Sequence, residues 1–283
     1  MAKSKWRAFP HPEKTYSYAG DALQKHWDRL HIGDREPFPS PAWVKAQIAA
    51  HPKLNPAGTP EECAESLQKA WRAYHRGDFG AAAETGKTLG PIGANAAAKA
   101  INIYATYLVE DAQEKVRLFL DAARLAEALQ KIAPENANAY YLHAQALGRY
   151  SQGVSVVKAL AEGLGGKVKY SLETALKHEK RHADAHIALG AYHAEIVDKI
   201  GGMIAGLTYG ASKEAAVKHF EEALKLNPGS AVARMEYANA LAMLFGQSKL
   251  KQASKLYEEA AACQPMDAME RLDVEAAKAE LEE

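Results

Sequence analysis

The chain has 283 residues, of which 48% are hydrophobic, and its 35 lysines and arginines are balanced by 35 aspartates and glutamates. This length supports a sizeable buried core, and a net charge of zero supplies no overall field that would attract nucleic acid or an anionic membrane. Two distant cysteines, Cys63 and Cys263, without any CxxC motif exclude a disulfide framework and a zinc ribbon.

The first residues, 1–17, read as an extended, polar segment that prolines interrupt, without the apolar run of a signal peptide. The longest weakly polar stretch, residues 200–211, is shorter than the roughly 20 residues that span a bilayer. We therefore expect a cytoplasmic protein with no membrane span and no nucleic-acid partner.

The front of the chain differs from the rest, because all four tryptophans fall within the first 71 residues. Leu23, Trp27 and Leu30 have the spacing of one helix face, and Ser40-Pro41 is a typical helix start. Tryptophans are too apolar to remain in water. We predict that residues 1–58 form an extension with two short helices, docked on the main body.

Residues 59–265 are rich in alanine, show the 3.6-residue period of helices and contain internal repeats. The clearest unit is AVKHFEEALKLNP at 216–228, followed by AVARMEYANAL at 231–241. Each unit predicts a pair of helices. Related units occupy 254–265, 170–193, 125–147 and, in the most diverged form, 67–89.

These units resemble tetratricopeptide (TPR) repeats. Leu189-Gly190 and Tyr237-Ala238 occupy the position of the closely packed pair in the first helix, and Phe220, Ala223 and Pro228 match the second helix. The resemblance implies an all-α solenoid in which antiparallel helix pairs form a right-handed superhelix.

The repeats are longer than the usual TPR unit of about 34 residues. In this respect they are similar to the microtubule-dynamics-regulator family and to bacterial TPR proteins associated with substrate-binding transport components. The additional residues form two apolar segments, about 152–167 and 196–211, each long enough for a short helix. In the second segment, glycines at every fourth position, 202, 206 and 210, would let another backbone approach closely if the segment is helical.

The apolar side chains of these insertions have three interpretations. They could line a cavity for a small apolar ligand, pack against one another, or meet a second copy of the chain in a homo-oligomer. The residues concerned are Val157, Leu160, Leu164, Ile200, Met203, Ile204 and Leu207.

The resemblance also implies a concave groove, lined by the first helix of each pair, that binds a peptide or a helix of a protein partner. No lysine stands at the position that chaperone-tail-binding members use, so that specificity is not expected. The alternative is an ordinary solvated helix face. The predicted groove residues are Asn138, Tyr141, Gln145, Asp184, Ile187, Met235 and Asn239.

Three histidines, His178, His182 and His186, would share a face of one continuous helix and could then hold zinc. The repeat alignment instead places a turn at about 180–183, so we expect neither a metal nor a cofactor. GxSxG and GxxxxGK[ST] motifs are absent, and the one HExxH match, at residues 178–182, spans this turn and so does not lie on one helix. We therefore expect the protein not to be an enzyme.

The last residues, 266–283, have a helical pattern with a polar face, which indicates a capping helix, the alternative being a tail that binds a partner. Together these features predict a non-catalytic protein-interaction scaffold or adaptor. The alternative function is a carrier or sensor of a small apolar ligand held between the inserted helices.

Overall fold

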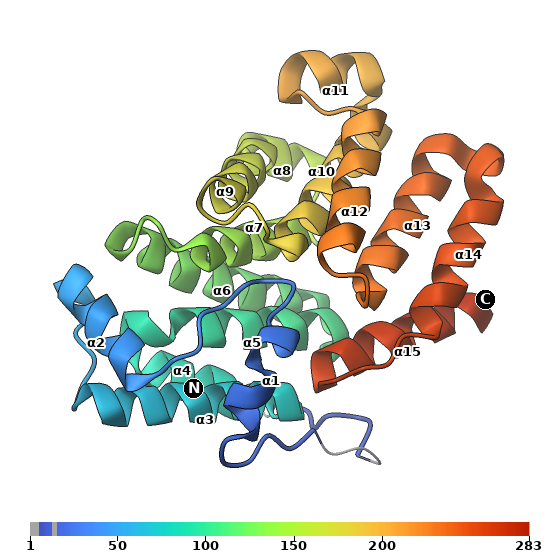
Figure 1. The fold of residues 1–283 in the computed structure, drawn as a ribbon. Coiled ribbons are helices and arrows are strands. Elements are labelled where there is room, and N and C mark those ends of the chain that lie inside the picture. The colour runs from blue at the N-terminus through green and yellow to red at the C-terminus, as the bar shows by residue number, and fades with distance from the viewer. Residues whose placement is uncertain (1–5, 13–15, 283) are drawn as a thin grey trace.

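The computed structural model describes residues 6–12 and 16–282. Within these residues the secondary structure consists of α-helices and short 3₁₀ helices, with no β-strand. Antiparallel helix pairs stack along a curved path (Figure 1). The predicted all-α solenoid is confirmed.

The N-terminal region contains α1 (Ala22–Leu30) and α2 (Pro41–Ala50). The Ser40 side chain accepts a hydrogen bond from the backbone N–H of Trp43 and so caps α2. Trp27 of α1 is buried, and its indole N–H donates to the backbone oxygen of Glu36 at 2.7 Å. The segment between the two helices is therefore tied to α1.

The main body, as far as the structure describes it, contains five helix pairs and a final helix. Each pair brings an apolar stripe of one helix against the next, which buries surface that a single pair would leave in water. The pairs are α3 (Pro60–Arg76) with α4 (Phe79–Thr88), α5 (Ala94–Tyr107) with α6 (Ala112–Ile132), α7 (Ala137–Gln152) with α9 (Leu164–His178), α10 (Ala183–Ile200) with α12 (Lys213–Leu226), and α13 (Ala231–Phe245) with α14 (Leu250–Ala261), followed by α15 (Ala268–Glu282).

Local sequence sets where these helices begin and end. Thr59 and Glu62 form a capping box at the start of α3, each side chain bonding to the other residue's backbone N–H. Gly77 ends α3 with a φ of 90°. A Cβ at this position would lie 2.6 Å from the ring of Phe9, so both the backbone angle and the space require glycine.

The closely packed pair of the TPR pattern appears where α10 meets α12. A Cβ on Gly190 would lie only 2.7 Å from the ring of Phe220. That ring in turn stacks on Tyr237 of α13, with 5.2 Å between ring centroids and 13° between planes. A glycine in one helix and aromatic rings in the next two thus hold three helices together.

The two insertions form α8 (Val156–Ala161), before α9, and α11 (Gly202–Tyr209), before α12. The expected close approach of another backbone along the α11 glycines is wrong. A Cβ on Gly202 would meet nothing within 4 Å, and one on Gly210 would meet only the amine of Lys169. One on Gly206 would meet only the carbonyl oxygen of Ala211, at 3.9 Å and in the turn that follows the same helix. Gly201 and Gly210 instead allow the positive φ angles of 77° and 62° that begin and end α11.

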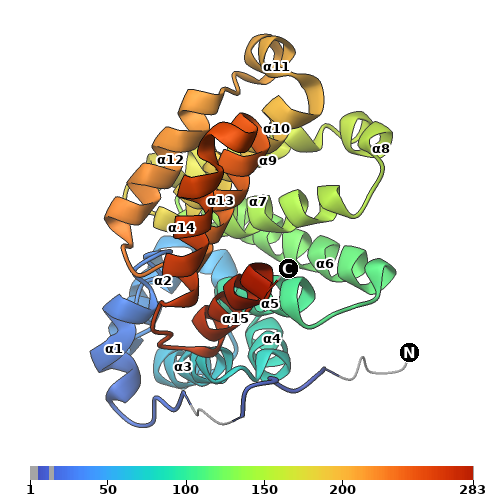
Figure 2. The ribbon, with the colours of Figure 1, turned by 90° about the vertical axis from the view of Figure 1, so that its right-hand side faces the viewer.

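Helix α15 joins the two ends of the solenoid. It packs on α13 and α14 and also on α3 (Figure 2). At its start, the Asp267 carboxylate lies 2.8 Å from Nδ1 of His75 in α3, and both side chains are buried. Arg29 of α1 forms an ion pair with Glu270 at 2.7 Å. The first and last helices of the described chain therefore meet.

Candidate functional site

The segment 31–38, between α1 and α2, crosses the first helices of three pairs and forms a buried polar network with them. The Asp34 carboxylate forms an ion pair with the amine of Lys99 in α5, and it lies 2.9 Å from Nδ1 of His31. Burial would lower the pKa of Lys99, but the charge of Asp34 outweighs this effect and raises it to about 12. The pair is therefore ionised.

Glu36 lies beside this ion pair. Its carboxyl oxygens accept hydrogen bonds from the side-chain amides of Asn138 at 2.6 Å and Asn95 at 3.0 Å. Burial, and secondarily the charge of Asp34, raise the pKa of Glu36 to about 8. At neutral pH this carboxyl group is therefore mostly protonated.

The network occupies one part of the predicted groove. Asn138 is held by Glu36 on one side, and on the other its Oδ1 lies 2.9 Å from Nε2 of His182. The backbone N–H of Asp184 donates to the carbonyl of Gly33 at 3.1 Å. The chain's own N-terminal segment thus fills the position in which a bound peptide would contact these two residues.

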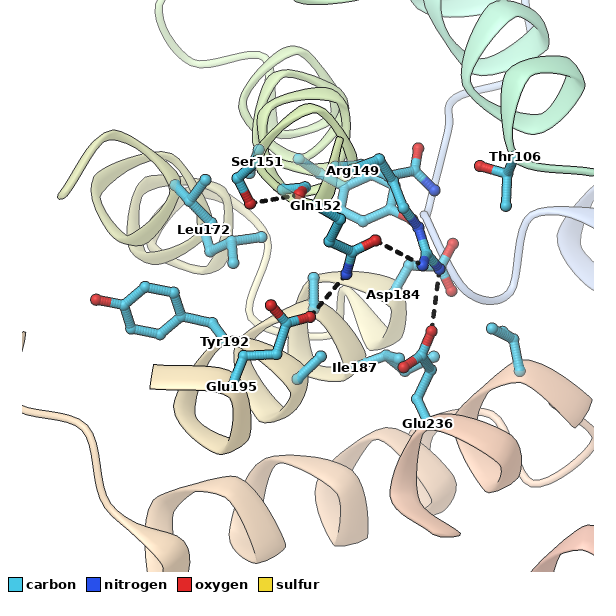
Figure 3. A pocket seen from close by; sticks show the side chains of 18 of the residues that line it. Thr106, Arg149, Ser151, Gln152, Leu172, Asp184, Ile187, Tyr192, Glu195 and Glu236 are labelled. Atoms are coloured by element: carbon cyan, nitrogen blue, oxygen red, sulfur yellow. Dashed lines mark hydrogen bonds and ion pairs between the residues drawn. The ribbon is translucent and has the colours of Figure 1, made fainter. Parts of the chain in front are cut away.

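Beside this network the concave side contains a pocket of about 260 Å³ between α5, α7, α9, α10, α13 and α15, and Asp34 and Lys99 of the network line it as well. Apolar side chains from different helices form its wall, as Figure 3 shows for Leu172, Ile187 and Tyr192. Four predicted groove residues line it, namely Tyr141, Gln145, Asp184 and Ile187, as do three of the predicted apolar residues, namely Leu160, Leu164 and Ile200.

Polar side chains cross one side of this pocket. Arg149 of α7 forms an ion pair with Glu236 of α13 at 3.0 Å, and Gln152 donates to Glu195 of α10 at 2.7 Å (Figure 3). The side chains of Arg149 and Glu236 are partly exposed. The pocket therefore combines an apolar wall with hydrogen-bonding groups that solvent reaches.

Two predicted groove residues lie elsewhere. Met235 packs against a cluster between α13, α14 and α15 that includes Val274. Asn239 is exposed, and its Oδ1 accepts a hydrogen bond from the hydroxyl of Tyr257. The seven residues therefore do not form one continuous surface.

Four of the predicted apolar residues also lie outside the pocket. They belong to the short helices α8 and α11 and are exposed to solvent, two of them by more than four fifths. These residues are Val157, Met203, Ile204 and Leu207.

The three histidines that sequence spacing brought together have different environments. His178 ends α9 and stacks on Tyr140, whereas His182 is buried and caps α10 by accepting from the backbone N–H of Ala185 at 3.1 Å. His186 faces another helix. Within residues 6–12 and 16–282, no group of three or more His, Cys, Asp or Glu side chains is arranged to hold a metal ion.

The profile of the family described as "Regulator of microtubule dynamics protein 1-3" matches residues 94–283, which is more than half of the chain. The chain belongs to this family. The matched region begins at α5 and includes most of the pocket wall. The N-terminal segment that fills part of the groove lies outside it.

A solved TPR structure has the same fold as this chain. The TPR protein TTC0263 from Thermus thermophilus is 17% identical, with a TM-score of 0.54 over 77% of this chain and 99% of that chain. The MamA protein is also 17% identical, with a TM-score of 0.37 over 78% of this chain and 96% of that chain. No curated protein matches. In the described part of the chain no helix is long and apolar enough to cross a membrane.

Sequence reasoning missed the polar residues of both sites. Arg149 and Glu236 are 87 positions apart, and neither belongs to a motif. Asp34 and Glu36 carry a weak signal, because they are acidic residues in a short proline-rich stretch beside a predicted tryptophan helix. The tryptophans should have indicated burial for these neighbouring carboxylates as well.

Proposed function

We propose that this chain is a non-catalytic interaction scaffold that binds a short segment of a protein partner. The observation that carries the proposal is the pocket at the open part of the concave side, with an apolar wall and an accessible polar edge. Such a combination suits a peptide, because apolar side chains enter the pocket while backbone groups meet polar side chains.

The volume of the pocket limits what the partner inserts. At about 260 Å³ it lies below the usual size range of sites for drug-sized molecules, which begins at about 300 Å³. One or two apolar side chains would fill it, whereas a whole helix would not. The partner segment that we propose is therefore an extended or turn-like peptide with one or two apolar anchor residues.

The family description makes a microtubule component the first partner to test. We would measure co-sedimentation of the purified chain with microtubules, and compare Ala191→Met, which fills the pocket from α10, with the unchanged chain. Asn239→Ala provides a control, because Asn239 is exposed and outside the pocket. Selective loss of binding in Ala191→Met supports the proposal, and equal binding by all three proteins contradicts it.

A second function is favoured by the apolar wall alone. Leu164, Leu172 and Ile187 would surround a small apolar ligand in the same volume. Native mass spectrometry of the purified chain, followed by organic extraction, would detect such a ligand. Its presence at equal stoichiometry in the Asn239→Ala control and its loss from Ala191→Met would favour a carrier over a peptide-binding scaffold.

A further inference from the structure

A pair of histidines faces each other on the side of α10 that does not line the pocket. Nδ1 of His186 in α10 lies 2.8 Å from Nδ1 of His219 in α12. Both side chains are partly exposed, so solvent reaches the pair. A third ring, His193, stacks on His219 with 5.5 Å between centroids and 12° between planes.

The surroundings of these imidazoles favour the neutral form. Burial lowers the pKa of His186, His193 and His219, and the neighbouring rings lower that of His219 further, to about 4. Two nitrogens at hydrogen-bonding distance also cannot both carry a proton. Neutral imidazole is the form that binds metal ions, because its unprotonated nitrogen has a free lone pair. One Nδ1 donates a proton to the other in the metal-free pair, and this proton moves to Nε2 of the same ring when both Nδ1 atoms bind a metal.

We propose that Nδ1 of His186 and Nδ1 of His219 together bind one copper(II) ion. With metal–nitrogen bonds of about 2.05 Å, two nitrogens 2.8 Å apart subtend about 86° at the metal. This angle is close to the right angle between neighbouring ligands in a tetragonal or octahedral site and far from the tetrahedral geometry of structural zinc. Imidazole ligands in tetragonal geometry favour copper(II), followed by nickel(II).

The surroundings of the pair allow such a site. Glu222 lies on α12 one turn beyond His219, and its negative charge acts on His186. Its carboxylate forms an ion pair with Lys225 at 3.4 Å. Two cations oppose it, Lys218 near His219 and Lys169 of α9 near His193. The chain therefore supplies two nitrogen ligands, and water completes the coordination.

His193 supports the pair without binding the metal. Its ring is buried against His219, and its Nδ1 has no hydrogen-bond partner. Stacking at an interplanar angle of 12° limits rotation of the His219 ring. The orientation of the His219 ring is thus fixed before the metal binds. This reduces the side-chain conformational entropy that is lost on binding.

The test is a copper(II) titration of the full-length chain at pH 7.5, followed by calorimetry and electron paramagnetic resonance. We expect one ion bound at this site, with hyperfine splitting from two nitrogens. His186→Asn and His219→Asn should each lower the affinity of that ion by about tenfold or more. His178→Asn removes another helical histidine on α9 and is the matched control, which should leave the site unchanged.

Other results would overturn the proposal. One is that all three variants bind copper(II) with the same stoichiometry and spectrum as the unchanged chain. The other is that the unchanged chain binds no copper(II) through two nitrogens. If either Asn variant fails to fold, copper(II) broadening of histidine ring resonances in the unchanged chain gives a second test. Broadening must then be strongest for His186 and His219, and strongest broadening elsewhere would exclude the site.

Discussion

Glu36 shows how burial can keep an acidic residue uncharged. In the folded chain its pKa is raised from 4.5 to about 8, first by burial and then by the charge of Asp34. The folded state therefore holds a proton that the unfolded chain releases between these two values. Because the folded state binds more protons in this interval, the free energy of unfolding falls as the pH rises from about 4.5 to about 8.

This protonation predicts the effect of Glu36→Gln. The amide has the shape of the protonated carboxyl group and no charge. Rotation of the Asn95 amide would place its Oδ1, which has no hydrogen-bond partner, where it can accept from the new group. We expect the variant to be more stable at pH 8.5, by on the order of a few kcal/mol, and to lose this advantage near pH 5.

Thermal unfolding of both proteins at pH 5, 7 and 8.5 measures this difference. Glu65→Gln is a suitable control, because Glu65 is an exposed carboxylate on α3. A stability gain for Glu36→Gln that is the same at all three pH values would contradict a raised pKa.

The neighbouring ion pair leads to a second prediction at this scale. The side chains of Lys99 and Asp34 are only 6% and 3% exposed. Lys99→Met keeps the length of the side chain but leaves the Asp34 carboxylate buried beside neutral partners. We expect a loss of about 3 to 5 kcal/mol in the free energy of unfolding, measured with urea.

The double variant Lys99→Met with Asp34→Asn separates charge from packing. It removes both charges while keeping side chains of similar size. We expect it to recover part of the stability that the single variant loses. Equal losses in the single and double variants would indicate that the Lys99 contacts, and not the uncompensated charge, are responsible.

Individual helices were more predictable than the sites they build. The α10 and α12 pair was predictable because Gly190, Phe220 and the 3.6-residue period are local signals that repeat along the chain. The pocket was only partly predictable. Tyr141 and Ile187 follow from repeat register, but the partners of Arg149 depend on how the superhelix curves, which no local pattern records.

The same limit explains why the filled part of the groove was missed. The contact between Asp34 and Lys99 joins residues 65 positions apart, in a non-repetitive segment and a repeat. The TPR resemblance describes how repeats stack on each other. It contains no information about a segment outside the repeats, so the position of residues 31–38 had to come from the structure.

The short helix α11 allows a prediction at the scale of the element. Met203 and Leu207 are 82% and 85% exposed, so they make almost no contribution to the core. Replacing both by serine should change the free energy of unfolding by no more than about 0.5 kcal/mol. Thermal unfolding checks this, and a loss of several kcal/mol would mean that α11 packs more closely than its exposure indicates.

Sedimentation velocity of the same variant addresses the homo-oligomer that the sequence suggested. If these side chains meet a second copy, the unchanged chain should self-associate and the serine variant should not. Identical sedimentation at matched concentrations would instead indicate that this apolar surface is not an interface between copies.

At the scale of the whole molecule, the contact between α3 and α15 predicts how the chain unfolds. Open repeat arrays unfold in parts, because each repeat contacts only its neighbours. Here His75 and Asp267, which are 1% and 2% exposed, join helices near opposite ends of the sequence. We expect Asp267→Ala to lower the stability of both ends together.

Hydrogen exchange followed by mass spectrometry tests this coupling. Amides of α3 and of α15 should exchange faster in Asp267→Ala, with similar changes in free energy. Asp121→Ala, in α6, is the control, because the ion pairs of Asp121 are with Arg117 and Arg124 of its own helix. Faster exchange confined to α15 would show that the two ends open independently.

Closure also has a mechanical consequence for the pocket. In a stack of helix pairs with free ends, each pair can rotate slightly relative to the next. These small rotations add up and widen or narrow the concave side. The contact between α3 and α15 joins the two ends of the stack and removes most of this freedom. The width of the pocket between α7 and α13 is therefore fixed once α15 packs on α3. A ligand meets a rigid opening, and the width of that opening depends on contacts between helices far from the pocket.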